Sequence, residues 1–216
     1  MVQREALPPL ASGSARDLKK GATLDGVEIT GVDLSGIRAG QVRLLEFAMT
    51  DCSADDLSTQ GVRAVDTHLG SLQFQTWTAA DGEWRDADFD HMRVGAWLAD
   101  GTEFVDVTIR ECKVDLLSLR QAKLRRVTLR ECRIETLDLT DADVSDVVID
   151  GGGIGDLITA GARMSDVDVA STVLDRVSHP GALRGLVMSD QQTADLAAIF
   201  ADYLGIATRV PDALPH

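Results

Sequence analysis

The residues that could do chemistry are spread along the chain without an obvious centre. Three cysteines, Cys52, Cys112 and Cys132, form no Cys-x-x-Cys pair, and their odd number is typical of a protein from a reducing cytoplasm. A zinc site needs ligands that converge on one point. The histidines show no such clustering: His68, His91, His179 and His216. The sequence therefore predicts no metal site and no cofactor.

Sequence motifs of catalysis and nucleotide binding are absent as well. The chain contains no G-x-S-x-G, phosphate-binding loop or dinucleotide fingerprint. The run Gly151, Gly152 and Gly153 has the composition of an anion-binding loop, but it keeps the register of the repeat described below, and we interpret it as a narrow corner. Carboxylates are abundant, yet nothing predicts a pocket that would raise the pKa of one of them. We expect a protein that is not an enzyme.

Composition narrows the class of protein further. The 216 residues are 44% hydrophobic but only 4% aromatic, which predicts an aliphatic core. No apolar run approaches the roughly 20 residues that cross a bilayer, and the N-terminal residues lack the apolar segment of a secretion signal. A formal charge of −14 argues against general nucleic-acid binding and favours a basic partner. We expect a cytoplasmic protein that contacts neither membrane nor nucleic acid directly.

A five-residue repeat must position every other feature. Every fifth residue from Leu24 to Leu174 is apolar, apart from Thr59 and Thr159, and we call these residues the centres. The residue two places before each centre is also apolar or small. A period of five matches neither a helix, at 3.6, nor a strand, at 2. Two residues at this spacing share a face only in a short extended segment, so the chain must turn after each one and wind into a coil.

Four repeats complete one turn of this coil. At a spacing of 20 residues, one column of the residues that precede the centres is uniformly large: Ile37, Leu57, Trp77, Trp97, Leu117, Leu137 and Leu157. The centres that follow the two tryptophans, Ala79 and Ala99, are small, which indicates volume compensation within one layer. The cross-section should be square. About eight coils over residues 22–181, at about 4.8 Å per layer, predict a rod roughly 38 Å long.

The blocks themselves resemble a known family. Ala122-Lys-Leu-Arg-Arg and Ala142-Asp-Val-Ser-Asp are close to the pattern A-[D/N]-L-x-x of pentapeptide-repeat proteins. The resemblance covers about three-quarters of the chain and implies an all-β fold, the right-handed quadrilateral β-helix. We divide the chain into an N-terminal lead-in at 1–21, with a short helix near 17–20, a β-helix at 22–188, and a C-terminal helix and tail at 189–216.

The C-terminal segment carries a helix signature. Ser189 and Gln192 form a capping box, Gly205 supplies a stop, and we predict one helix from about 190 to 204. Its apolar face would either cover the open end of the solenoid or join two copies. The residues of this cap or dimer contact are Leu196, Ile199, Phe200, Tyr203 and Leu204. The resemblance to the bacterial members that protect DNA gyrase implies a homodimer through this helix.

Acidic residues recur two places after the centres, at a spacing of 20. The column reads Glu46, Asp66, Asp86, Asp106, Asp146 and Asp166, with Arg126 as its one interruption. Stacking would align these carboxylates along one edge of the rod. The edge is open to two interpretations. It either imitates the phosphates of DNA for a basic partner, or it reflects only the suitability of aspartate for tight corners and its effect on solubility.

A second surface, over residues 110–133 with Arg93, mixes both signs of charge. Its cations alternate with Glu111, Glu131 and Glu135, and we expect many of them to form surface ion pairs that contribute little each.

Taken together, these features favour a non-enzymatic binding rod. The resemblance implies a DNA mimic that acts on a type II topoisomerase, DNA gyrase. The alternative is a scaffold for an unrelated protein partner, bound through the mixed-charge surface.

Overall fold

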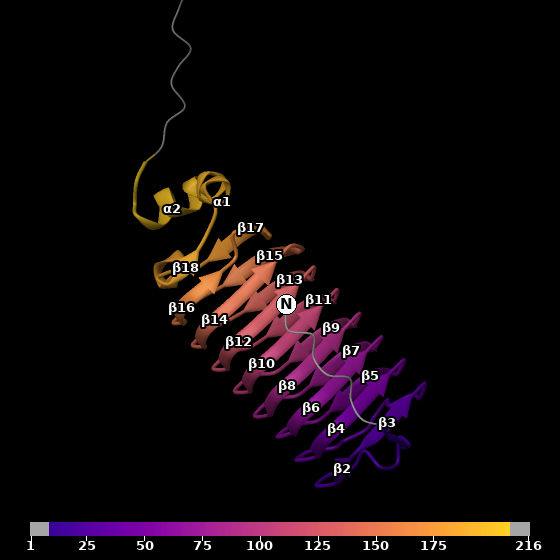
Figure 1. Cartoon of the computed structure of the whole chain (residues 1–216). Helices are drawn as coiled ribbons and strands as arrows, with labels where there is room; N and C mark the ends of the chain where they lie inside the picture. Colours follow the sequence, from indigo (N-terminus) through magenta and orange to yellow (C-terminus); the bar gives the residue numbers. More distant parts are fainter. Residues whose placement is uncertain (1–8, 208–216) are drawn as a thin grey trace, which may run out of the picture.

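Each coil of the chain consists of a long strand and a shorter one, joined by tight corners. The computed structural model describes residues 9–207 and shows a β-solenoid of about nine turns (Figure 1). The long strands form sheet A: β1 (Ala11–Ser12), β2 (Thr23–Asp25), β3 (Val27–Thr30), β4 (Arg43–Thr50), β6 (Arg63–Gly70), β8 (Glu83–Asp90), β10 (Glu103–Arg110), β12 (Lys123–Arg130), β14 (Asp143–Asp150), β16 (Arg163–Asp168) and β18 (Leu186–Val187). The shorter strands form sheet B: β5 (Ser53–Ser58), β7 (Gln73–Thr78), β9 (Arg93–Leu98), β11 (Lys113–Ser118), β13 (Arg133–Asp138), β15 (Gly153–Ile158) and β17 (Val173–Ser178).

All of these strands pair in parallel, and from β2 to β17 the register is a constant 20 residues. Val114 on β11 lies between Val94 on β9 and Ile134 on β13, and the same offset holds along sheet A from β4 to β16. The predicted β-helix with four repeats per coil is therefore confirmed. The solenoid is slightly longer than the eight coils expected because β1 and β18 extend sheet A at its two ends.

Three of the four corners use a left-handed backbone. The corner residue has a positive φ in each of three columns, exemplified by Asp66 (φ 53°), Glu111 (φ 50°) and Asp81 (φ 57°). Glycine adopts this conformation freely, and aspartate and asparagine tolerate it better than most other residues. The fourth corner, which includes Asp56, lies within the strands of sheet B, and no residue of that column between 56 and 176 has a positive φ. The corner geometry thus favours aspartate and glycine for a backbone reason.

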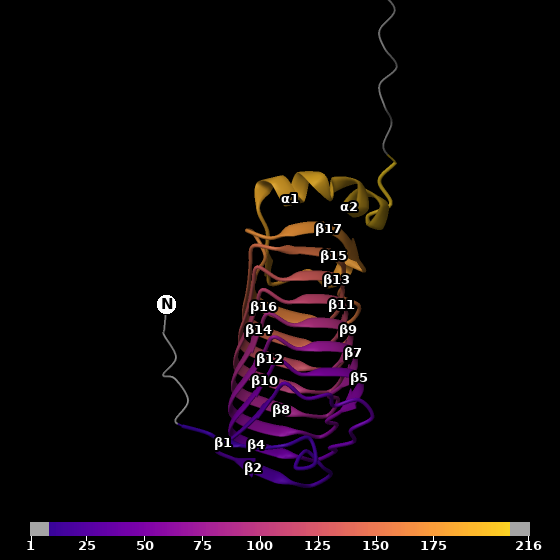
Figure 2. The same cartoon turned by 90° about the vertical axis from the view of Figure 1, so that its right-hand side faces the viewer.

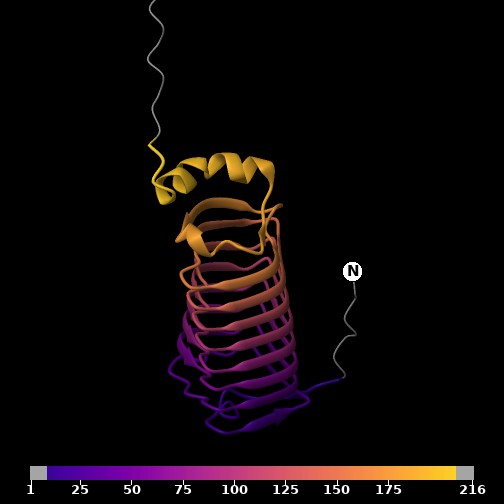
Figure 3. The same ribbon diagram turned by 90° about the vertical axis from the view of Figure 1, so that its left-hand side faces the viewer.

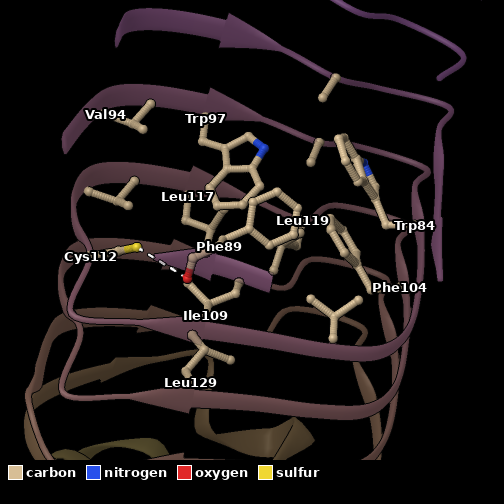
Figure 4. Packing of buried hydrophobic residues seen from close by; sticks show 14 of the residues in the cluster. Trp84, Phe89, Val94, Trp97, Phe104, Ile109, Cys112, Leu117, Leu119 and Leu129 are labelled. Atoms are coloured by element: carbon tan, nitrogen blue, oxygen red, sulfur yellow. Dashed lines mark hydrogen bonds between the residues drawn. The ribbon is translucent and has the colours of Figure 1, made fainter. Parts of the chain in front are cut away.

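The centres and the residues two places before them fill the interior of the rod. Trp77 stacks on Trp97 one layer away, with ring centroids 4.8 Å apart and planes 18° apart. Ala79 and Ala99 are fully buried beside them, which confirms the predicted compensation of volume. Figure 4 shows Trp97 beside Phe89, at a centroid distance of 4.9 Å. The core is continuous from Leu18 to Leu196.

Polar residues that interrupt the apolar pattern are also buried, and most have partners. The Thr59 hydroxyl accepts a hydrogen bond from Nε1 of Trp77 at 3.0 Å. Thr102 donates to the carbonyl of Ala79 at 2.8 Å and accepts from the Gly82 amide at 3.2 Å. These threonines satisfy groups that would otherwise be buried without a hydrogen bond, which explains why the pattern tolerates them.

The N-terminal end of the solenoid is not closed by the predicted helix. The expected helix near residues 17–20 is absent, and the chain forms turns there. The Asp17 amide donates to the Ser14 carbonyl at 3.0 Å and closes a turn, and the Ser14 amide and hydroxyl both donate to Asp17 Oδ2 at 2.8 Å. Leu18 then enters the open end of the core and is only 2% exposed. The lead-in therefore contributes to the hydrophobic core.

At the C-terminal end, a 3-10 turn (Pro180–Ala182) leads through β18 to two short helices that lie across the last coil (Figures 2 and 3). The capping box of Ser189 and Gln192 is confirmed. The single helix expected at 190–204 is divided into α1 (Asp190–Asp195) and α2 (Ala197–Tyr203). The break is at Leu196, whose ψ of 3° departs from helical values while its side chain is buried against the core.

Candidate protein-binding surfaces

The predicted acidic column forms one exposed corner of the rod. All its residues lie inside the long strands of sheet A, between the two flat halves of each strand, and all are exposed. They share the left-handed backbone, with φ from 44° at Glu46 to 55° at Asp106. Neighbouring members are one layer apart, because the strands that carry them pair at an offset of 20 residues. We call Glu46, Asp66, Asp86, Asp106, Asp146 and Asp166 the acidic edge.

Arg126 occupies the same corner and neutralises part of this edge. Its guanidinium binds the Asp106 carboxylate through two hydrogen bonds, Nε to Oδ1 at 2.6 Å and Nη2 to Oδ2 at 2.7 Å. These bonds hold the pKa of Asp106 below its ordinary value and raise the pKa of Arg126. Asp86 lies on one side of this neutral section and Asp146 on the other, so the edge carries two separate acidic runs.

The mixed-charge surface divides into two parts with different behaviour. On sheet A, Arg110 approaches Asp90 at 3.9 Å and Arg130 approaches Asp150 at 3.3 Å, as expected for surface ion pairs. On sheet B, the cations Arg93, Lys113 and Arg133 are exposed and stack on one another in register. No acidic residue within 9–207 lies within 4.0 Å of these three cations. The expectation of surface ion pairs is therefore confirmed for Arg110 and Arg130, and it does not hold for these three cations.

The apolar residues of the C-terminal segment also divide into two groups. Leu196 is 2% exposed, and Ile199 and Phe200 pack partly buried against the core, so these three cover the last coil. Tyr203 and Leu204 are 60% and 67% exposed. The first group forms a cap, and the second leaves an apolar patch at the end of the rod.

The cysteines lie inside the rod and do not form a reactive site. Cys112 and Cys132 are 2% and 4% exposed, and their thiols contact backbone carbonyls, including Arg110 O at 3.1 Å and Arg130 O at 3.3 Å. Figure 4 marks the longer contact of Cys112 with the Phe89 carbonyl. A hydrogen bond with Cys132 and burial both raise the pKa of Cys112, which keeps this thiol protonated.

Among residues 9–207, open hollows lie on the face formed by sheet B. Their walls include Gln75, Gly95 and Arg93 in one case and Arg133 with Gly153 in another. In the part of the chain that the structure describes, no group of three metal-ligating side chains is placed to hold an ion. None of the helices between residues 9 and 207 has the length and apolar character needed to span a bilayer.

Comparison with known proteins finds similar solved structures. Two trypsin-treated variants of QnrB1, described as a plasmid-mediated fluoroquinolone resistance protein, are each 15% identical to this chain. The alignments cover 92% and 88% of this chain and 96% and 86% of QnrB1, with TM-scores of 0.33 and 0.32. HetL, a pentapeptide-repeat protein involved in heterocyst differentiation in the cyanobacterium Nostoc sp. strain PCC 7120, is 14% identical over 78% of this chain and 90% of its own, with a TM-score of 0.29. No family model and no curated protein matches the chain.

Proposed function

We propose that this pentapeptide-repeat rod is a non-enzymatic, cytoplasmic protein-binding module whose acidic edge docks in a basic groove of its partner. The observation that carries the proposal is the exposed line of carboxylates on a corner of a rod with a filled interior. Substrates bind in concave, mostly apolar pockets, whereas the hollows here are shallow and polar. A straight charged edge suits recognition of a complementary surface.

The charges of the edge are spaced more widely than those of a DNA strand but run in a straight line over a similar length scale. From Glu46 to Asp166 the column spans six layers, (166 − 46)/20, or about 29 Å at about 4.8 Å per layer. One strand of B-DNA carries one charge about every 3.4 Å. The resemblance to gyrase-protecting proteins then makes DNA gyrase the partner that we propose, with the acidic edge in place of one phosphate strand.

A supercoiling assay with purified gyrase tests this function. The protein in micromolar excess should alter supercoiling, and the triple variant Asp86→Asn, Asp146→Asn and Asp166→Asn should need roughly tenfold more protein for the same effect. Asparagine keeps the left-handed backbone accessible, so the rod should fold normally. Absence of any effect of the unmodified protein would remove gyrase as the partner.

The chain offers a matched control for the acidic edge. Asp51, Asp81 and Asp141 have the same left-handed backbone, with φ of 53°, 57° and 57°, but lie at the other two corners. Their replacement by asparagine removes the same charge from the rod. We expect these control substitutions to change the activity by less than about twofold. An equal loss in both triple variants would show that net charge, and not the acidic edge, is responsible.

We further propose that two rods associate through their C-terminal ends. Three apolar side chains there are more than half exposed, Tyr203 at 60%, Leu204 at 67% and Ile206 at 54%. Exposed apolar groups gathered at one place are typical of interfaces. Leu204→Asp should convert a dimer to a monomer in sedimentation analysis. Val148→Asp is the control, because the same column already holds aspartate at Asp88 and Asp168. A monomeric unmodified protein would contradict the dimer.

A further inference from the structure

Eight of the 19 lysines and arginines between residues 9 and 207 follow a simple stacking rule. A basic side chain lies one layer above or below an acidic one, and the two form an ion pair. Arg63 pairs with Glu83 at 3.4 Å, and Arg163 pairs with Asp143 at 3.6 Å. The same holds for Arg38–Asp56, Arg85–Glu103, Arg110–Asp90, Arg126–Asp106, Arg130–Asp150 and Arg176–Asp156. The rule removes repulsion between like charges on neighbouring strands.

On sheet B, three successive cations of one column do not follow this rule. Arg93, Lys113 and Arg133 lie directly above one another on β9, β11 and β13 (Figure 1), with neutral Gln73 below them and Gly153 above. We call these three residues the basic ladder. Like charges at this separation repel one another, and no acidic residue among those described forms an ion pair with any of the three. The ladder is therefore a column of three cations without ion pairs on a molecule of charge −14.

Carboxylates border the ladder on both sides without pairing with it. At the neighbouring corner, Glu111 binds His91 instead, with Oε2 at 3.1 Å from Nε2, and Glu131 follows one layer above. On the opposite side Asp115 and Glu135 extend from the same strands. The basic ladder is thus one residue wide, with negative borders.

Glycines hollow the surface at both ends of the ladder. A Cβ at Gly95 would lie 2.6 Å from the Gln75 carbonyl oxygen, so a side chain cannot be accommodated beside Arg93 without a shift of the backbone. Gly152 and Gly153 leave a second hollow next to Arg133. Arg93 and Lys113 line both hollows, together with Asp115 in the first and Glu111 and Glu131 in the second.

We propose that the basic ladder binds a short acidic peptide segment of a protein partner, laid along the rod axis. Its carboxylates would take the place of the acidic residues that accompany cations elsewhere on the rod. The hollows at Gly95 and Gly153 give the segment room to approach the cations. This surface faces away from the acidic edge, on the other sheet, so the two surfaces can act independently.

The carboxylates that border the basic ladder favour a peptide over a nucleic acid as its ligand. A nucleic acid gains affinity from many phosphate contacts along a broad basic surface. Here only three cations are available, and the phosphates of a wider polyanion would meet Glu111, Glu131, Asp115 and Glu135. A single extended acidic segment fits between these borders.

Fluorescence anisotropy tests the proposal with a fluorescein-labelled hexaglutamate at about 50 mM salt, where electrostatic contacts are weakly screened. We expect binding that weakens with added salt, and no comparable binding of labelled hexaglutamine. The variant Arg93→Gln, Lys113→Gln and Arg133→Gln should bind hexaglutamate at least roughly tenfold more weakly. The control Arg63→Gln, Arg110→Gln and Arg130→Gln removes the same charge from paired positions and should change binding by less than about twofold.

Thermal stability provides a second, independent readout. Removal of the ladder relieves repulsion and should raise the Tm by about 1–3 °C, whereas the control variant loses ion pairs and should not gain stability. Three results would overturn the proposal. They are equal binding of hexaglutamate and hexaglutamine, equal loss in the two triple variants, and tighter binding of a 12-nucleotide single-stranded DNA than of hexaglutamate. A ladder variant with a lowered Tm would likewise contradict it.

Discussion

Arg126 and Asp106 lie one layer apart at the same corner and form a doubly hydrogen-bonded ion pair, with N–O distances of 2.6 and 2.7 Å. Arg126 has the left-handed backbone of the acidic residues that it interrupts, with a φ of 53°. Both side chains are about half exposed, so solvent screens the pair and it contributes little to stability. Its larger effect is on the charge pattern, because it removes one negative charge from the middle of the acidic edge.

The first prediction concerns this pair. In Arg126→Gln the pKa of Asp106 should rise toward its ordinary value, because the hydrogen bonds and the positive charge are both lost. A carboxylate with a lowered pKa stabilises the folded state above its unfolded pKa, and this stabilisation is lost as the pH falls through the folded pKa. The variant should therefore lose slightly less stability than the unmodified protein between neutral and acidic pH.

Carbon-detected NMR titration of the Asp106 carboxyl would measure this change. Arg130→Gln serves as the control, because Arg130 pairs with Asp150 on a neighbouring column and should leave the pKa of Asp106 where it was. An unchanged pKa of Asp106 in Arg126→Gln would contradict the conclusion that the Arg126 guanidinium lowers this pKa.

The second prediction concerns the glycine corner. Gly152 has a φ of 66°, and a Cβ there would lie 1.9 Å from the Cys132 carbonyl oxygen, so Gly152→Ala requires a shift of the backbone between layers. We expect a loss of more than about 3 kcal/mol in the free energy of unfolding, from strain and from the clash. Gly31→Ala is the control, because Gly31 has a φ of 67° but open space around it, and should lose only about 1–2 kcal/mol.

Urea unfolding monitored by tryptophan fluorescence would compare the two glycine variants. Similar losses in both would mean that the backbone conformation alone, and not the contact with the layer below, makes the glycine necessary.

The third prediction concerns the C-terminal cap. The buried side chain of Gln192 accepts a hydrogen bond from the Ser189 amide at 2.7 Å and donates to the carbonyls of Val169 and Thr172 at 2.7 and 2.8 Å. Gln192→Ala removes both bonds to these carbonyls. The Thr172 carbonyl loses its donor while the Val169 carbonyl keeps the Thr172 amide at 3.1 Å, which should cost about 1–3 kcal/mol locally. Gln191→Ala removes an exposed neighbour that bonds only Asp195 and should be nearly neutral.

Hydrogen exchange of the backbone amides would measure this local loss of stability, because a solenoid opens from its ends. Faster exchange in Gln192→Ala should be confined to the last coils and the helices. Unchanged exchange there, or the same increase in Gln191→Ala, would contradict the role of Gln192 as the anchor of the cap.

The repeat made the interior predictable. The burial of Ile29, Leu34 and Trp97 follows from a local period of five, and each neighbour one layer away follows from the period of 20. The capping box of Ser189 and Gln192 was predictable for the same reason, because its two partners are only three residues apart in the sequence. The turn at Ser14 was missed because it competes with a helix of similar local propensity. The break at Leu196 was missed because it depends on contact with the last coil.

The sequence by itself determined the coil, its layers and the columns of charge, because these follow from spacing along one chain. Only the tertiary structure decided which charges are compensated. A corner residue and its neighbour on the flat face point in different directions, so Glu111 binds His91 and leaves Lys113 alone, although both glutamate and lysine were visible in the pattern. Likewise, only the packing of α2 separated Phe200, which covers the core, from Leu204, which faces outward.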